Sequence, residues 1–246
     1  MTDLLLNHFY VTPDRATFEA AERSGFLREL GPLEKRTTVR KDTTYTGLYL
    51  YGENTYLELL HPESASFGAP SGIAYGVERE GGIAGVCEVL RATRVEEVSR
   101  GEVPWFKSCR PPQLPGLAEW VMEYVPAFFQ GFHPDLPPIR PTLSRSDALT
   151  RYAASCGKLG DRTNGLFEDV IGLDVLLAPP DAAAWNARPV RVAGADVRVS
   201  PAARGDAVGI REARLRLRRD AGRSVQQIGS TTLSLDGRSA VWRFQP

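Results

Sequence analysis

The chain has 246 residues, of which 42% are hydrophobic and 24% are charged, a balance typical of a globular protein with a sizeable core. Its 30 basic and 30 acidic side chains cancel at pH 7, so no overall field attracts nucleic acid or an anionic membrane. No apolar run is long enough to span a bilayer, and the N-terminus has an acid where a signal peptide carries a base. We therefore expect a cytoplasmic protein without nucleic-acid or membrane partners.

The cysteines give no sign of a covalent framework. Cys87, Cys109 and Cys156 are odd in number and far apart, and none belongs to a CxxC pair. This spacing argues against a disulfide scaffold and against a structural zinc site. We expect three free, mostly buried thiols.

The chain opens with a strand followed by a helix. Residues 4–11 (LLLNHFYV) alternate as a strand that places Leu4, Leu6, His8 and Tyr10 on one face. Thr12 followed by Pro13 is typical of a helix start, with Thr12 as the N-cap. Residues 35–41 then predict a second strand.

The most informative stretch is residues 43–62, TTYTGLYLYGENTYLELLHP, in which two alternating runs flank a turn at Glu53 and Asn54. This is a β-hairpin pattern. The register it predicts pairs Tyr51 with Tyr56, Leu50 with Leu57, Tyr49 with Glu58, and Leu48 with Leu59. One face is then all leucine and suits a covering helix. The other face carries Tyr45, Tyr49, Tyr51, Tyr56 and Glu58, which suits either the wall of a polar-aromatic pocket or an ordinary exposed strand face.

The order β-α-β-β-β recurs along the chain. It predicts an α+β fold with a first unit at 1–62, a second at 72–130 and a C-terminal α+β segment at 144–246 that can be parsed as a third unit. The further elements expected are strands at 72–78, 95–98, 104–108, 117–125, 167–178, 190–199, 209–218 and 231–244, the last broken by a turn at Asp236 and Gly237, and helices at 83–92, 144–156 and 180–186.

This pattern resembles the glyoxalase, or vicinal oxygen chelate, superfamily, whose domains are paired βαβββ modules with curled sheets around a central site. The residues that carry the resemblance are the opening strand LLLNHFYVTPD, the fourth strand TYLELLHP, the strand GIAYGVE at Gly72 and the strand WVMEYVP with Glu123. They cover about the first 130 residues, and the C-terminal hundred lie beyond a minimal two-module member. Such proteins often pair modules between chains, so the resemblance also implies a homodimer.

The resemblance implies a divalent metal held by His8 and Glu58, with Glu123 as a third ligand. Imidazole and carboxylate together suit Zn, Fe, Mn, Ni or Co. The alternation independently places His8 and Glu58 on one concave face. One departure is that Ser71 and Gly72 stand where the second module should offer a histidine, so a metal-free site stays open.

Two classes of function follow for a small-molecule ligand. The first is a lyase- or isomerase-type enzyme in which His8, Glu58, Tyr49 and Tyr56 carry the chemistry. Its substrate would contact Tyr10, Tyr45, Tyr51, Val121 and Glu123. The second is a non-catalytic, drug-sequestering protein of the same fold. A purely structural ion pair between His8 and Glu58 is a third interpretation.

Overall fold

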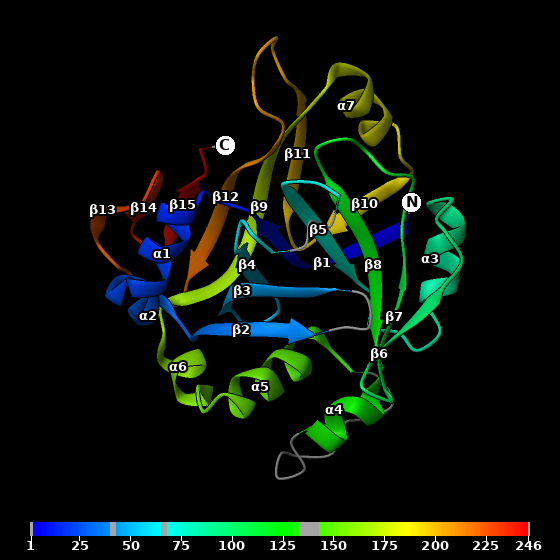
Figure 1. Ribbon diagram of the computed structural model, residues 1–246, viewed down its shortest axis with the longest axis horizontal. Helices are drawn as coiled ribbons and strands as arrows, with labels where there is room; N and C mark the ends of the chain where they lie inside the picture. Colours follow the sequence, from blue (N-terminus) through cyan, green and yellow to red (C-terminus); the bar gives the residue numbers. More distant parts are fainter. Residues whose placement is uncertain (1, 40–42, 65–67, 133–142, 246) are drawn as a thin grey trace.

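Residues 2–39, 43–64, 68–132 and 143–245 are described by a computed structural model. Within them the chain is a mixed α+β fold made mostly of strands, which form two curled mixed sheets with helices around them (Figure 1). None of the helices in these ranges is long and apolar enough to cross a membrane.

The first sheet has nine strands in the described residues, in the order β2-β3-β4-β1-β5-β8-β7-β6, with β10 paired to the start of β1. We call β2-β3-β4-β1 the first half-sheet and β5-β8-β7-β6 the second half-sheet. The bounds are β1 (Thr2–Val11), β2 (Leu33–Val39), β3 (Thr44–Tyr51), β4 (Tyr56–Leu60), β5 (Ser71–Gly76), β6 (Glu96–Arg100), β7 (Val103–Cys109), β8 (Ala118–Tyr124) and β10 (Val190–Ala193).

The β3–β4 hairpin has the register predicted from its sequence. Tyr49 pairs with Glu58, and Leu50 pairs with Leu57. The leucines of the hairpin are buried in the main hydrophobic cluster, whereas Tyr49 and Tyr51 belong to a separate aromatic cluster. The two faces are kept apart because a slip of one residue would mix them.

The second sheet covers the leucine face. It has the order β11-β9-β12-β15-β14-β13 in the described residues. Its side chains, including Phe167 and Leu173, share one cluster with the leucines of the hairpin. The bounds are β9 (Phe167–Leu177), β11 (Asp196–Pro201), β12 (Gly209–Leu217), β13 (Arg223–Ile228), β14 (Thr231–Asp236) and β15 (Ser239–Arg243).

The helices lie outside the sheets (Figure 1). Their bounds are α1 (Arg15–Arg23), α2 (Gly25–Leu30), α3 (Ile83–Val89), α4 (Pro126–Phe132), α5 (Arg145–Ser155), α6 (Leu159–Asn164) and α7 (Pro179–Asn186). Asp14, not Thr12, caps α1, because its carboxylate accepts the backbone N–H of Thr17 at 2.9 Å. Helix α5 starts with a reciprocal capping box between Ser144 and Asp147.

The strict alternation expected for the opening strand is wrong at one point. The pairing of β1 with β5 shifts register between Leu6 and His8. Leu4 and Leu6 therefore share the main cluster with Phe9, while His8 faces the opposite side. A bulge of this kind re-aims the side chains that follow it.

The expectation of three free thiols is also wrong. Cys87 in α3 and Cys109 at the end of β7 form a disulfide with a Cα–Cα distance of 6.3 Å. The two residues are 22 positions apart and meet only because α3 packs against the second half-sheet. Cys156 is the free cysteine, and burial raises the pKa of its thiol.

The C-terminal segment departs from the expected third unit in two places. The single strand expected at 190–199 is two strands: β10 joins β1 of the first sheet, and β11 joins β9 of the second. Strand β13 was not expected and forms the edge beside β14.

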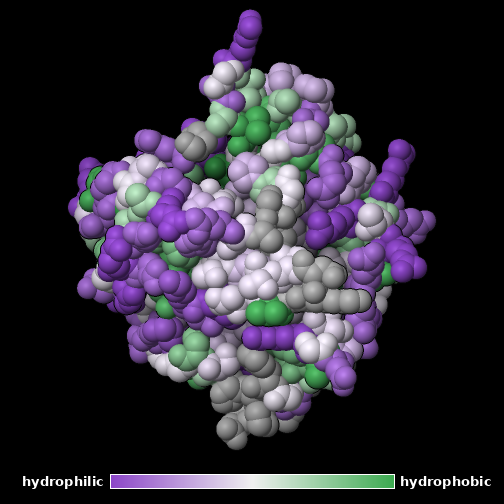
Figure 2. Space-filling view, in the orientation of Figure 1, coloured by the Kyte–Doolittle hydropathy of each residue, from purple (hydrophilic) through white to green (hydrophobic). Residues whose placement is uncertain are grey.

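On the face in Figure 2, hydrophilic side chains predominate, and hydrophobic ones gather beside α7 and β11.

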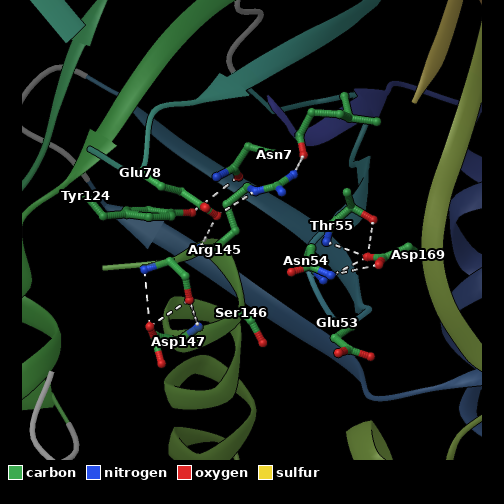
Figure 3. Close-up of polar contacts among 12 residues, drawn as sticks. Asn7, Glu53, Asn54, Thr55, Glu78, Tyr124, Arg145, Ser146, Asp147 and Asp169 are labelled. Atoms are coloured by element: carbon green, nitrogen blue, oxygen red, sulfur yellow. Dashed lines mark hydrogen bonds and ion pairs between the residues drawn. The ribbon is translucent and has the colours of Figure 1, made fainter. Parts of the chain in front are cut away.

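A carboxylate of the second sheet holds the turn of the hairpin. Asp169 in β9 accepts the backbone N–H groups of Asn54 and Thr55 at 2.8 and 2.9 Å, and also the Thr55 hydroxyl at 3.0 Å (Figure 3). Arg162 in α6 donates to the carbonyl oxygens of Gly52 and Glu53 in the same turn. The turn that leads into β4 is therefore fixed from both sides.

Candidate functional site

One cavity lies on the face of the first sheet that is opposite to the leucines. Its volume is about 180 Å³, room for roughly 12 to 18 water molecules and hence for a small organic ligand. Arg36 of β2 and Val98 of β6, from opposite ends of the strand order, both line it, so the sheet curls around it. The other lining residues used below are His8, Tyr10, Tyr45, Tyr56, Glu58, Trp105, Phe106, Arg110, Trp120, Met122, Tyr124 and Tyr152.

The two polar groups predicted to meet do meet in this cavity. His8 Nε2 lies 3.7 Å from Glu58 Oε1, and both side chains are less than a tenth exposed. Tyr56 stacks on the His8 ring at a centroid distance of 4.2 Å, and Trp120 meets it edge-on at 5.3 Å. Strands β1 and β4 run parallel, with His8 opposite Tyr56 and Tyr10 opposite Glu58, so the imidazole meets the carboxylate diagonally across the two strands.

Asn7 determines which nitrogen of His8 faces Glu58. The Asn7 Oδ1 atom lies 2.8 Å from His8 Nδ1. The same oxygen also accepts the Tyr124 hydroxyl at 3.3 Å (Figure 3). An amide oxygen can only accept hydrogen bonds, so His8 Nδ1 carries a hydrogen. In the neutral ring the lone pair is then on Nε2, which faces Glu58. The bulge in β1 makes this possible because it turns Asn7 to the cavity side.

The phenols of the site are neutral. Burial raises the pKa of Tyr56 well above its usual range, with Tyr124 and Glu58 adding to the effect. Burial likewise raises the pKa of Tyr124 to about 12 and that of Tyr152 well above its usual range. A neutral phenol donates hydrogen bonds but does not act as a base. The buried candidate proton acceptors in the cavity wall are therefore His8 and Glu58, whereas Glu96 lines the cavity from an exposed position.

The expected placement of Glu123 and Val121 is wrong. Strand β8 presents Trp120, Met122 and Tyr124 to the cavity, so the intervening residues face the other side. The Glu123 carboxylate accepts the backbone N–H groups of Gly81 and Ile83 at 2.9 and 3.0 Å, at the start of α3. Its role is to hold this helix.

The residues do not fit a resident metal ion. In the described ranges no three His, Cys, Asp or Glu side chains come together, and Glu123 is turned away, which leaves His8 and Glu58 alone. Catalytic zinc sites usually have three protein ligands. A histidine at position 72 is also precluded, because even a Cβ there would lie 2.4 Å from the Tyr10 ring.

The remaining predicted residues divide into two groups. Tyr10 and Tyr45 line the cavity as expected. Tyr49 and Tyr51 do not line it, because they pack behind it in the aromatic cluster with Tyr152.

Sequence reasoning missed several cavity residues. These are Arg36, Trp105, Phe106, Arg110, Trp120 and Tyr152. For Trp120 the sequence offered one signal. The alternation of strand residues in WVMEYV puts Trp120 and Glu123 on opposite faces, so only one of the two could line the cavity. For Tyr152 the sequence offered none, because α5 approaches the first half-sheet only through tertiary packing.

Comparison with known protein families gives a match over almost the whole chain. A family model described as "Family of unknown function (DUF5829)" matches residues 6–244. The chain belongs to the DUF5829 family. No curated protein matches it. The DUF5829 match runs from β1 to β15, so the cavity and the second sheet belong to one family unit.

Proposed function

We propose that this chain is a small-molecule enzyme of the vicinal oxygen chelate type, which catalyses a lyase- or isomerase-type proton transfer on a carbonyl- or phenol-bearing metabolite. The observation that carries the proposal is the pair of His8 Nε2 and Glu58 Oε1, 3.7 Å apart in the wall of an aromatic cavity. A buried imidazole and a buried carboxylate on one face of a sheet are costly for the fold, which favours a functional role for the pair.

The topology supports the family type. In the first half-sheet β1 runs parallel to β4, and in the second half-sheet β5 runs parallel to β8. The two halves meet where β1 and β5 pair antiparallel. A helix follows the first strand of each half, so each half has the order β-α-β-β-β. Paired units of this kind are what the resemblance implies.

The proposed reaction uses the His8–Glu58 pair as general base and then as general acid. The pair removes a proton from a carbon beside the carbonyl group, and the electron pair of the C–H bond moves onto the carbonyl oxygen. A proton then returns from the pair to another carbon of the conjugated enolate, which gives an isomer, or the electrons expel a leaving group, which takes up the proton from the pair and leaves an alkene. While the proton is held by the pair it can exchange with solvent. Asn7 holds the imidazole in the tautomer that can accept the proton at Nε2. No step requires a metal ion.

The proposal is tested by hydrogen exchange in D₂O. The protein is incubated with phenylpyruvate, acetophenone and hydroxyacetone, and loss of the proton signal beside the carbonyl is followed by NMR. General acid–base groups contribute about 100-fold or more to rate, so His8→Asn and Glu58→Gln should each slow exchange by about that factor. A chelator should leave the wild-type rate unchanged. Exchange that is equally fast in both variants would refute the proposal.

The second candidate is ligand binding without catalysis, as in drug-sequestering members of the same superfamily. The aromatic lining favours it, because Tyr56, Trp105 and Trp120 offer stacking surfaces for a flat ligand whether or not a reaction follows. Wild-type protein that binds the three probes but exchanges none of their protons would support this candidate over the enzyme.

A further inference from the structure

Arg36 is a cation in the cavity wall that the proposed proton transfer does not use. It lies on β2, its side chain is 15% exposed, and it lines the same cavity as His8 and Glu58. Its guanidinium carbon lies 4.0 Å from the centre of the Tyr49 ring and 5.3 Å from the centre of the Tyr152 ring. These two rings orient the guanidinium and shield it from bulk water.

One side of this guanidinium is engaged by the protein and the other is not. Nη1 donates to Glu34 Oε2 at 3.3 Å and to the Tyr51 hydroxyl at 3.1 Å. Among the described residues the hydrogen bonds of Arg36 all start from Nη1, which leaves the Nη2 and Nε donors for another partner. The fork formed by these donors matches a carboxylate, which it can bind through two parallel hydrogen bonds.

The distance across the sheet defines the length of a ligand that could use both ends of the cavity. Strand β2 is two strands away from β4, which carries Glu58. Neighbouring strands lie about 4.8 Å apart, so the backbones of β2 and β4 are separated by about 10 Å. Trp105, Phe106 and Tyr152 line the space and offer flat surfaces for stacking. A ring system with one acidic group spans this length.

The charges of the cavity wall oppose a second acidic group. Glu58 and Glu96 both line the cavity, and a ligand carboxylate beside either would be repelled at close range. Arg110 is the other cation of the lining, but it is exposed and therefore screened by solvent. Arg36 is therefore the cation of the cavity wall that can attract an acidic group with little screening by solvent.

We propose that the cavity binds a flat aromatic monocarboxylate, whose acid group pairs with Arg36 and whose opposite end lies against His8 and Glu58. The position of the acid group follows from Arg36 alone. The statement that the opposite end is the reacting end rests on the proposed function.

The competing interpretation is that Arg36 only neutralises Glu34 and orders Tyr51. The two interpretations differ in what a neutral ligand of the same shape would do. 2-Naphthoate and 2-naphthamide have the same ring and the same number of heavy atoms, but only the first carries a charge. Their binding can be measured by calorimetry and by fluorescence, because Trp105 and Trp120 line the cavity.

The full-length protein should bind 2-naphthoate at least about 10-fold more tightly than 2-naphthamide, the ratio expected for one charge-assisted hydrogen-bonded pair. Arg36→Gln should remove this ratio and change the affinity for 2-naphthamide by less than about 3-fold. Arg36→Lys should keep part of it, since lysine retains the charge and loses the fork. Arg28→Gln, an exposed arginine on α2, is the matched control and should leave the ratio unchanged.

Three results would overturn the proposal: equal wild-type affinities for the two probes, a ratio that survives in Arg36→Gln, or a ratio removed by Arg110→Gln instead. The wild-type comparison requires no variant and therefore stands even if Arg36→Gln fails to fold. Equilibrium binding also separates this proposal from the reaction. Preferred 2-naphthoate binding without any C–H exchange would refute the enzyme and leave the Arg36 site in place. C–H exchange without preferred 2-naphthoate binding would refute the Arg36 site and leave the enzyme in place.

Discussion

The two half-sheets have the same strand order but use their carboxylates differently. In the first half-sheet Glu58 faces the cavity and lies beside His8. In the second half-sheet Glu119 and Glu123 face away from the cavity and bind structural donors. Equivalent topology thus produces one half with a buried carboxylate in the cavity wall, which is the chemical half under the proposed function, and a scaffolding half. Which face of the strand carries the acid decides between the two roles.

The largest expected effect comes from breaking the scaffolding half. Glu119 is buried and accepts hydrogen bonds from Tyr75, Trp185 and Arg188. Glu119→Gln leaves Arg188 without its counter-charge, and loss of one partner of a buried pair costs about 3–5 kcal/mol. Urea unfolding measures the change. Glu58→Gln is the control and should cost clearly less; equal losses in the two variants would contradict the division of roles.

The disulfide should be the next strongest contribution to the scaffolding half. Cys87 and Cys109 close a loop with a sequence separation of 22, for which the chain-entropy model gives about 3 kcal/mol. Cys87→Ser combined with Cys109→Ser should lower the free energy of unfolding by that amount. Added reductant should destabilise the wild type and leave the double variant unchanged. Cys156→Ser, in the free thiol, should have little effect, and a loss there of similar size would count against the assignment.

In the chemical half, Asn7 should act through His8 and not through folding. Asn7→Leu removes the acceptor of the Nδ1 hydrogen, and loss of such a supporting partner typically costs about 10-fold in activity. The exchange rate in D₂O measures this effect, and ¹⁵N NMR of the imidazole should show a change of tautomer. Asn7→Asp retains an acceptor oxygen and should keep the Nδ1 hydrogen. An unchanged tautomer in Asn7→Leu would remove Asn7 from the site.

The smallest effect concerns a phenol shared by the two halves. Tyr124 of the second half-sheet contacts Asn7 of the first, and burial raises its pKa from 10.0 to about 12. Because the pKa of Tyr124 is raised in the folded state, the contribution of this phenol to the free energy of unfolding is complete below pH 10. It is lost as the pH rises towards 12. At about pH 10.5 the loss from this group should be about 0.8 kcal/mol. Tyr124→Phe should reduce the alkaline loss of stability in urea unfolding; an unchanged pH dependence would contradict the assignment.

The hairpin was predictable in full because its signals are local. Turn residues at Glu53 and Asn54 and strict alternation on both sides allow one register, and that register is observed. The convergence of His8 and Glu58 was also predicted, although Leu4 and Leu6, which were expected on the face of His8, lie on the opposite face because of the bulge. Periodicity of two is a reliable guide where one face is purely apolar.

Other features could not be predicted because they depend on contacts between distant segments. In β8 both faces carry large side chains, so the sequence does not show which face lines the cavity. The prediction placed Glu123 on the cavity side, but Trp120 and Met122 occupy that side. The bulge at Asn7 depends on the pairing with β5. The disulfide requires α3 and β7 to be adjacent. None of these three features has a marker within its own segment.

The hydrogen bonds from the hairpin turn to Asp169 determine how the chain can be truncated. A fragment that ended before Phe167 would retain every residue proposed for proton transfer, yet the donors of Asn54 and Thr55 would lose their acceptor and the leucines would face water. The second sheet is therefore not an appended accessory. Truncation to a minimal catalytic piece should yield an aggregating fragment, and engineering of this scaffold has to keep both sheets.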